Sequence, residues 1–261
     1  MNLPSSTKLN KRLFHEQSDF QKIEVYETEH FGKALFLDNV EQFCEADEIK
    51  YHQAMTKVPI LIHGKTKNVL IIGGGDGAIA RECLKYKNIN CIDQCEIDEK
   101  VVNVCKKFFP NMACSFDNPK VNLTYGDAKE FVKQSNKKYD VILVDSTDPI
   151  NKSKPLFEKN FYEDLKKLLN KNGILCCQMQ TPAVNFTLGS KVFSYLYETF
   201  SDLNFFFSTY ARIESNEYTL FSISSDTKIN IPISLSPLFM LFQPEYKKVK
   251  NFLNKLNWIK R

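Results

Sequence analysis

Short apolar segments alternate with longer segments of helical periodicity from about residue 48 onward. The apolar segments predict strands at residues 68–72, 90–96, 121–125, 140–144, 173–179, 205–210 and 218–222. The periodic segments predict helices near residues 78–87, 99–109, 128–135, 158–170 and 187–200. Regular alternation of this kind favours parallel strands joined by right-handed crossovers, with helices on both faces. The pattern therefore predicts a doubly wound α/β sheet.

The first part of the chain has a different pattern. Residues 20–46 alternate between apolar and polar positions, with turn signals at residues 30–32 and 38–39. Alternation with a period of two predicts a small antiparallel β unit. We therefore divide the chain into a β unit at residues 1–47 and an α/β domain at residues 48–261, which ends in a basic amphipathic helix at residues 245–261.

Composition excludes several classes of protein. Hydrophobic residues make up 43% and charged residues 25%, as in soluble globular proteins. The apolar runs are too short to span a bilayer and the N-terminus lacks a signal-peptide core, so we expect a cytoplasmic protein. Eight cysteines without a CxxC pair predict reduced thiols, and four histidines without ligand spacing predict no metal site. A net charge of +4 does not indicate nucleic-acid binding, and the C-terminal helix is expected to be an ordinary surface helix.

A glycine-rich turn follows the strand at residues 68–72. The glycines permit a tight strand-to-helix turn and let a ligand approach the backbone at a helix N-terminus. The spacing of Gly73, Gly75 and Ala78 fits the dinucleotide fingerprint, and Glu96 ends the next strand about twenty residues later. NAD is therefore one candidate ligand, although Glu96 could equally cap the next helix.

Carboxylates follow the predicted strands at their carboxyl ends. In a parallel sheet these ends meet at one edge, so we expect the following side chains to converge there: Asp76, Glu96, Asp127, Asp145 and Asp148. Such a field repels a pyrophosphate and attracts a polycation together with a nucleoside that carries no phosphate. An adenosyl sulfonium fits this edge better than NAD. Asp148 precedes Pro149, where an Asx-turn is an equally good explanation.

An ordered series of motifs carries a family resemblance over residues 18–180. The motifs are Phe20-Gln21, Phe31-Gly32, Leu37-Asp38, Gln42, Asp47-Glu48, Tyr51-His52, Val58-Pro59, Val69–Gly77, Arg81-Glu82, Gln94–Asp98, Gly126-Asp127, Asp145–Pro149, Leu156-Phe157, Phe161-Tyr162 and Gly173–Gln178. Together they resemble the spermidine synthase family of polyamine aminopropyltransferases. The resemblance implies a Rossmann-like, methyltransferase-type domain.

The resemblance also implies a reaction and a donor site. The family transfers a 3-aminopropyl group from decarboxylated S-adenosylmethionine, a co-substrate, to a diamine such as putrescine, releasing methylthioadenosine without a prosthetic group. Glu96 would then bind the ribose hydroxyls, Asp127 with Ala128 the adenine, and Asp76 the aminopropyl ammonium. The remaining donor residues implied are Gln21, His52, Gly73 and Gly75.

On the acceptor side, the resemblance makes Asp145 the proton acceptor, Asp148 and Tyr51 the groups that hold the diamine, and Gln178 a lining residue or a plain polar strand end. A homodimer or homotetramer is implied as well. The chain departs from the family at residues 150–155 and 210–217, where acceptor loops are expected. These departures leave open a weakly active member that regulates an active partner. An amine N-methyltransferase using S-adenosylmethionine also stays open, because it resembles the same scaffold and can retain the glycine-rich loop.

Overall fold

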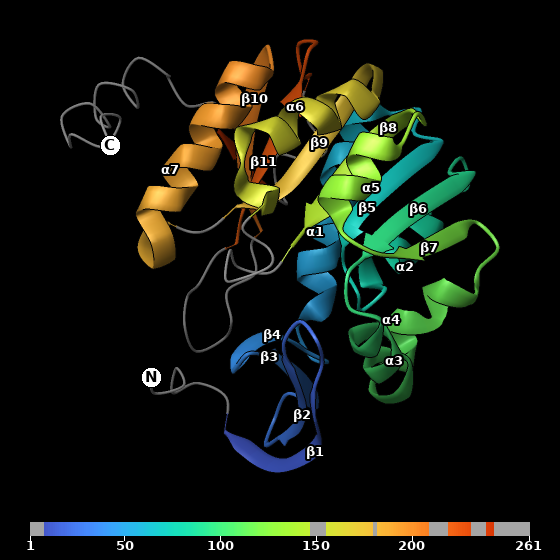
Figure 1. The fold of residues 1–261 in the computed structure, drawn as a ribbon, viewed down its shortest axis with the longest axis vertical. Coiled ribbons are helices and arrows are strands. Elements are labelled where there is room, and N and C mark those ends of the chain that lie inside the picture. Colours follow the sequence, from blue (N-terminus) through green and yellow to red (C-terminus); the bar gives the residue numbers. More distant parts are fainter. Residues whose placement is uncertain (1–7, 147–154, 180–181, 209–218, 231–238, 243–261) are drawn as a thin grey trace.

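Two sheets organise the chain in the computed structural model, which describes residues 8–146, 155–179, 182–208, 219–230 and 239–242 (Figure 1). The first sheet is antiparallel and has the order β1-β2-β3-β4. Its strands are β1 (Leu9–Gln17), β2 (Lys22–Thr28), β3 (Lys33–Leu37) and β4 (Val40–Cys44). Asp38 and Asn39 adopt positive φ values of 49° and 68° and form the two-residue turn of the β3–β4 hairpin, as the turn signal predicted.

The second sheet has eight strands in the order β12-β10-β11-β9-β8-β5-β6-β7. Its strands are β5 (Asn68–Gly73), β6 (Cys91–Glu96), β7 (Val121–Tyr125), β8 (Tyr139–Asp145), β9 (Leu169–Met179), β10 (Asp202–Ser208), β11 (Leu220–Ser225) and β12 (Phe239–Phe242). Strands β7, β6, β5, β8 and β9 are parallel, which confirms the doubly wound sheet. The strand order reverses between β5 and β8, where such sheets bind ligands.

Two strands at one end of the sheet do not run in the parallel direction that the alternation favoured. Strand β11 is antiparallel to both β9 and β10, and β12 is antiparallel to β10. A short apolar segment has the same pattern in either direction, so periodicity alone did not reveal this. Strand β1 and the segment 110–117 were missed for a related reason, since β1 has mostly polar residues and the segment 110–117 is too short to show a period.

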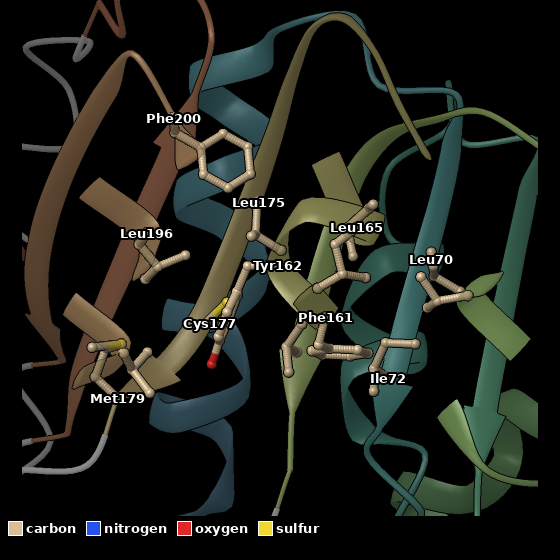
Figure 2. Close-up of a cluster of buried hydrophobic side chains, with 14 of the residues drawn as sticks. Leu70, Ile72, Phe161, Tyr162, Leu165, Leu175, Cys177, Met179, Leu196 and Phe200 are labelled. Atoms are coloured by element: carbon tan, nitrogen blue, oxygen red, sulfur yellow. The ribbon is translucent and has the colours of Figure 1, made fainter. Parts of the chain in front are cut away.

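Helices cover both faces of the large sheet. Helices α1 (Glu48–His63) and α2 (Ala78–Leu84) pack on the face formed by Val69, Ile71 and alternate residues of neighbouring strands. On the other face lie α5 (Ala128–Gln134), α6 (Lys159–Leu168) and α7 (Pro182–Thr199), against Leu70 and Ile72 (Figure 2). Because alternate residues of β5 point to opposite faces, one four-residue apolar run serves both halves of the core.

The small sheet docks on the large domain through a third apolar cluster. Ile23, Leu35 and Phe43 of the small sheet pack against α3 (Glu99–Phe108) and the segment formed by α4 (Pro110–Ala113) and the 3-10 turn Cys114–Asp117. This docking places the β3–β4 hairpin beside the carboxyl ends of β5 and β6, below α1 in Figure 1.

The eight cysteines form no disulfide with one another, and six of them are buried. Among the helices of the described residues, none has the length and apolar character needed to cross a membrane. The predicted C-terminal helix at 245–261 and the loops at 150–154 and 210–217 lie outside the described residues.

Candidate active site

A cavity of about 330 Å³ opens at the carboxyl ends of β5, β6 and β8, with the β3–β4 hairpin on its other side. A volume of this size suits a small organic ligand. The cavity brings together the predicted site residues Gln21, Tyr51, His52, Gly73, Gly75, Asp76, Glu96, Asp127, Ala128, Asp145 and Gln178. Asp148, predicted to hold the diamine, lies outside the described residues.

Carboxylates dominate the lining of this cavity. The acidic residues are Asp38, Glu41, Asp47, Glu48, Asp76, Glu96, Asp127 and Asp145, and no Lys or Arg lies among the described lining residues. Sequence reasoning did not assign the first four to the site. Asp38 and Glu41 belong to the β3–β4 hairpin, which docks beside the cavity. Asp47 and Glu48 lie at the N-terminus of α1. Such a field concentrates cationic ligands and repels phosphates.

The glycine turn after β5 fixes Asp76. Gly73 and Gly74 have φ values of 79° and 66°, a region that favours glycine. The side-chain amide of Gln94 donates to the carbonyl oxygens of Gly73 (2.8 Å) and Gly74 (2.7 Å). One oxygen of Asp76 accepts a hydrogen bond from the backbone N–H of Ala78 at 2.6 Å, at the start of α2. The carboxylate is thus held at the floor of the cavity.

We expect Gly73→Ala to lower the free energy of unfolding by about 2–4 kcal/mol, because it combines strain with overpacking. A Cβ at this position would lie 2.0 Å from the backbone oxygen of Asp145 on the neighbouring strand. Urea denaturation measures the loss. Gly126→Ala is the matched control, since its Cβ meets nothing within 4 Å, and an equal loss in both variants would contradict the packing argument.

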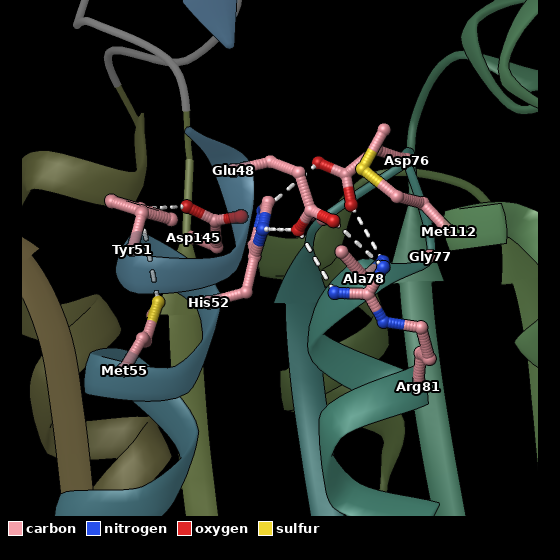
Figure 3. A network of polar contacts seen from close by, with 12 residues as sticks. Glu48, Tyr51, His52, Met55, Asp76, Gly77, Ala78, Arg81, Met112 and Asp145 are labelled. Atoms are coloured by element: carbon pink, nitrogen blue, oxygen red, sulfur yellow. Dashed lines mark hydrogen bonds and ion pairs between the residues drawn. The ribbon is translucent and has the colours of Figure 1, made fainter. Parts of the chain in front are cut away.

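His52 lies between two carboxylates in the interior. Its Nδ1 is 2.9 Å from Glu48 Oε2 and its Nε2 is 3.5 Å from Asp76 Oδ2 (Figure 3). Burial alone would lower the pKa of His52, but Asp76 and Glu48 outweigh it and raise the pKa to about 10. Asp76 in turn keeps a lowered pKa, because His52 outweighs the effect of burial. The two carboxylates therefore favour the imidazolium form of His52.

This charge state bears on metal binding. Ligand atoms of His52, Asp76 and Asp145 lie within 4.8 Å of one another, the spacing of a possible metal site. Both nitrogens of His52 face carboxylates, however, with Nδ1 toward Glu48 and Nε2 toward Asp76, so the ring joins the acidic groups to one another. The cluster is better described as a buried ion network than as a metal centre.

Asp145 ends β8 at the centre of the cavity. The hydroxyl of Tyr51 donates a hydrogen bond to Asp145 Oδ1 and lies 2.9 Å from Gln178 Oε1. Burial, and next the charge of Asp76, raise the pKa of Asp145 to about 6, although His52 and Tyr51 act in the opposite direction. A carboxylate in this condition can accept a proton near neutral pH and release it again.

Glu96 ends β6 on the far side of the glycine turn. Burial raises its pKa to about 7, and it accepts a hydrogen bond from the backbone N–H of Asp98 at 2.9 Å. Gly75 lies against it, since a Cβ there would be 2.9 Å from Glu96 Oε2. Asp98 also accepts a hydrogen bond from the Gln21 side chain at 3.1 Å, which ties the small sheet to this wall.

Asp127 lies at the rim and is exposed. It caps α5 by accepting a hydrogen bond from the backbone N–H of Lys129 at 2.7 Å. Its neighbour Ala128 is buried and lines the cavity. The arrangement offers one carboxylate oxygen and a helix N-terminus to a ligand on this side.

Comparison with known proteins places this site in context. Residues 48–232 match the family described as spermine/spermidine synthase domain, and residues 2–45 match the spermidine synthase tetramerisation domain. The chain is 44% identical over 195 residues to a polyamine aminopropyltransferase of Methanocaldococcus jannaschii, covering 75% of this chain and 67% of that protein. It is 40% identical over 205 residues to a spermine synthase of Arabidopsis thaliana, covering 78% of this chain and 57% of that protein.

Two solved structures have the same fold. One is a spermidine synthase in complex with the transition-state analogue AdoDATO, with a TM-score of 0.80 and 28% identity over 87% of this chain and 77% of that chain. The other is the spermidine synthase of Thermotoga maritima, with a TM-score of 0.79 and 28% identity over 87% of this chain and 76% of that chain. These matches confirm the resemblance that the sequence motifs predicted.

Proposed function

The chain belongs to the spermidine synthase family, and from that premise we propose that it transfers a 3-aminopropyl group from decarboxylated S-adenosylmethionine to a diamine. We propose putrescine as the acceptor, spermidine as the product and methylthioadenosine as the leaving group. One observation carries this proposal: the cavity at the switch point is lined by carboxylates, with neither Lys nor Arg among the described lining residues. Both substrates are cations, whereas a nucleotide cofactor with phosphates would be repelled.

The donor occupies the side of the cavity formed by β5, β6 and α5. Glu96 accepts hydrogen bonds from the ribose, and the glycine turn lets the nucleoside approach the backbone closely. Asp127 and Ala128 border the adenine, and Gln21 closes this side from the small sheet. The Asp76 carboxylate faces the aminopropyl ammonium. No prosthetic group takes part.

The acceptor occupies the side formed by α1, β8 and β9. An amine is protonated near neutral pH and has no lone pair for attack, so the reaction needs a base. Asp145, whose pKa of about 6 makes it a carboxylate at neutral pH, takes that proton. Tyr51 and Gln178 orient Asp145 and the amine, and Asp148 holds the distant nitrogen. The amine then displaces a neutral thioether in line, without an acid to assist the leaving group.

We also propose that the protein works as a homodimer or homotetramer. The match of residues 2–45 to the tetramerisation domain supports this, because these residues include all four strands of the small sheet. A second copy of the chain is the partner.

An assay of products tests the proposed reaction. The pure protein is incubated with putrescine, cadaverine, agmatine or spermidine and with either decarboxylated or intact S-adenosylmethionine, and products are followed by mass spectrometry. We expect methylthioadenosine to form only with the decarboxylated donor and an amine, and fastest with putrescine. Formation of S-adenosylhomocysteine would indicate the N-methyltransferase instead. Donor binding without any product would indicate a regulatory member of the family.

A further inference from the structure

A series of charged contacts connects Arg81 on α2, which lies outside the cavity lining, with Asp76 in the cavity. Arg81 donates to both carboxylate oxygens of Glu48, at 2.8 Å and 2.9 Å (Figure 3). Glu48 lies one helical turn before His52 and bonds its Nδ1, while Nε2 of the same ring faces Asp76. Arg81 itself does not line the cavity, so its contact with the site passes through Glu48.

We propose that Glu48, held by Arg81, is a positioning residue that keeps His52 cationic and turned toward Asp76, so that Asp76 and Asp145 stay ionised together. The proposal rests on the proposed function, in which Asp76 holds the donor and Asp145 accepts the proton.

The geometry explains why a simple structural ion pair does not account for Glu48. A pair with Arg81 would satisfy both charges at the helix–helix contact by itself. Glu48 instead also bonds the ring of His52, whose side chain is only 2% exposed and whose second nitrogen points at a cavity carboxylate. The fork of Arg81 fixes both oxygens of Glu48, and Glu48 in turn fixes the orientation of the ring.

The groups around His52 set the sign of the effect. Glu48 and Tyr51 face it from α1, Asp76 from the glycine turn and Asp145 from β8, while the Phe43 ring of β4 lies 6.4 Å away between ring centres. Asp145 is faced in turn by Tyr51, Gln178, Asp76 and His52, and its charge also acts on Glu96.

The ionisation of Asp76 and of Asp145 depends on the charge of His52. Asp76 raises the pKa of Asp145 and His52 lowers it, so a neutral His52 would leave the repulsion between the carboxylates uncompensated. Glu48 itself is ionised, because His52 and Arg81 outweigh burial and lower its pKa to about 2. Loss of the Glu48 charge therefore lowers the pKa of His52, so that the ring becomes neutral at a lower pH and leaves Asp76 and Asp145 to repel each other above that pH.

The test uses Glu48→Gln in the full chain, because glutamine keeps the size and the hydrogen bond but removes the charge. We expect the pKa of His52, followed by NMR of its ring protons, to fall by about one unit or more from its value of about 10, and the alkaline limb of kcat/KM, where His52 loses its proton, to move to lower pH. The His52 signals are assigned by their loss in His52→Gln. If this limb of the pH profile moves by one pH unit, kcat/KM at a given pH on the limb falls about tenfold.

A double-mutant cycle tests the part played by Arg81. If Arg81 acts through Glu48, Arg81→Gln lowers kcat/KM in the wild type and has little further effect in the Glu48→Gln background. Lys85→Met is the matched control, since Lys85 directly follows α2 and its described ion pair is with Glu82 rather than with Glu48. It is expected to move neither the NMR titration nor the pH profile.

Three results would overturn the proposal. The first is a wild-type His52 that titrates near its ordinary pKa of about 6.5, which needs no variant at all. The second is a Glu48→Gln enzyme whose activity falls while the His52 titration and the alkaline limb stay in place. The third is a double variant in which the effects of Arg81→Gln and Glu48→Gln on kcat/KM add fully. A wild-type protein that transfers no aminopropyl group would refute the proposed function, and the NMR titration would still decide the role of Glu48.

Discussion

Asp145→Asn is expected to lower kcat by a factor of about 10²–10⁴, the usual contribution of a general base. Asparagine has nearly the same shape, and its side-chain oxygen can still accept the hydrogen bond that Tyr51 gives to Asp145. It cannot take a proton from the ammonium of the acceptor. The loss therefore arises in the chemical step and not in the architecture of the cavity.

Donor affinity should change little in this variant. The charge of Asp145 raises the pKa of Glu96, so its removal favours the ionised form of a residue proposed to bind the ribose. Stopped-flow or single-turnover kinetics give the rate of the chemical step, and calorimetry with decarboxylated S-adenosylmethionine gives the affinity. In the wild type, turnover should also fall as the pH drops through about 6, where Asp145 becomes protonated, and the variant should lack this limb.

Asp140→Asn is the matched control. It makes the same substitution on the same strand, but at the opposite end of β8, where Asp140 accepts hydrogen bonds from the backbone N–H groups of Lys67 and Asn68. We expect it to cost some stability and to leave kcat unchanged. If Asp145→Asn weakens donor binding as much as it slows turnover, the base has been assigned to the wrong residue.

The part of the site that follows from parallel-sheet topology could be predicted from the sequence. Asp76, Glu96, Asp127 and Asp145 each lie at the carboxyl end of a short strand or within three residues after it, and in a parallel sheet all such positions meet at one edge. Their convergence in one cavity needed only the strand directions to be right. Strands β11 and β12 run the other way, but they lie at the far end of the sheet and do not disturb this edge.

The remaining acids depend on contacts between distant elements. Glu41 reaches the cavity because the small sheet docks on α3 through apolar residues such as Ile23 and Val101, and periodicity does not report where one sheet docks on another domain. Glu48 and Arg81 are 33 residues apart in the chain, and their pairing joins α1 to α2. Asp148 and the two departing loops stay predictions, since residues 147–154 and 209–218 lie outside the described residues.

Asp76→Asn is expected to weaken binding of decarboxylated S-adenosylmethionine by a factor of about 10–100, because a hydrogen bond to a charged group contributes about 1.5–3 kcal/mol. Asp76 should also discriminate between donors. Its carboxylate attracts the aminopropyl ammonium, and it repels the carboxylate that intact S-adenosylmethionine still carries. The variant keeps the side-chain oxygen that accepts from the N–H of Ala78, so the glycine turn is expected to survive.

The test compares the affinity for decarboxylated S-adenosylmethionine with the affinity for intact S-adenosylmethionine. The ratio of the two is measured by calorimetry on the same protein. We expect this ratio to shrink in Asp76→Asn but not in Asp93→Asn, which removes a carboxylate of equal exposure, 9%, from β6 outside the cavity. A ratio that stays unchanged would mean that the other carboxylates of the cavity set donor selectivity together. Because Asp76 accepts the N–H of Ala78 at the start of α2 and faces Nε2 of His52, we expect its removal to have a larger effect on this ratio than removal of the other carboxylates.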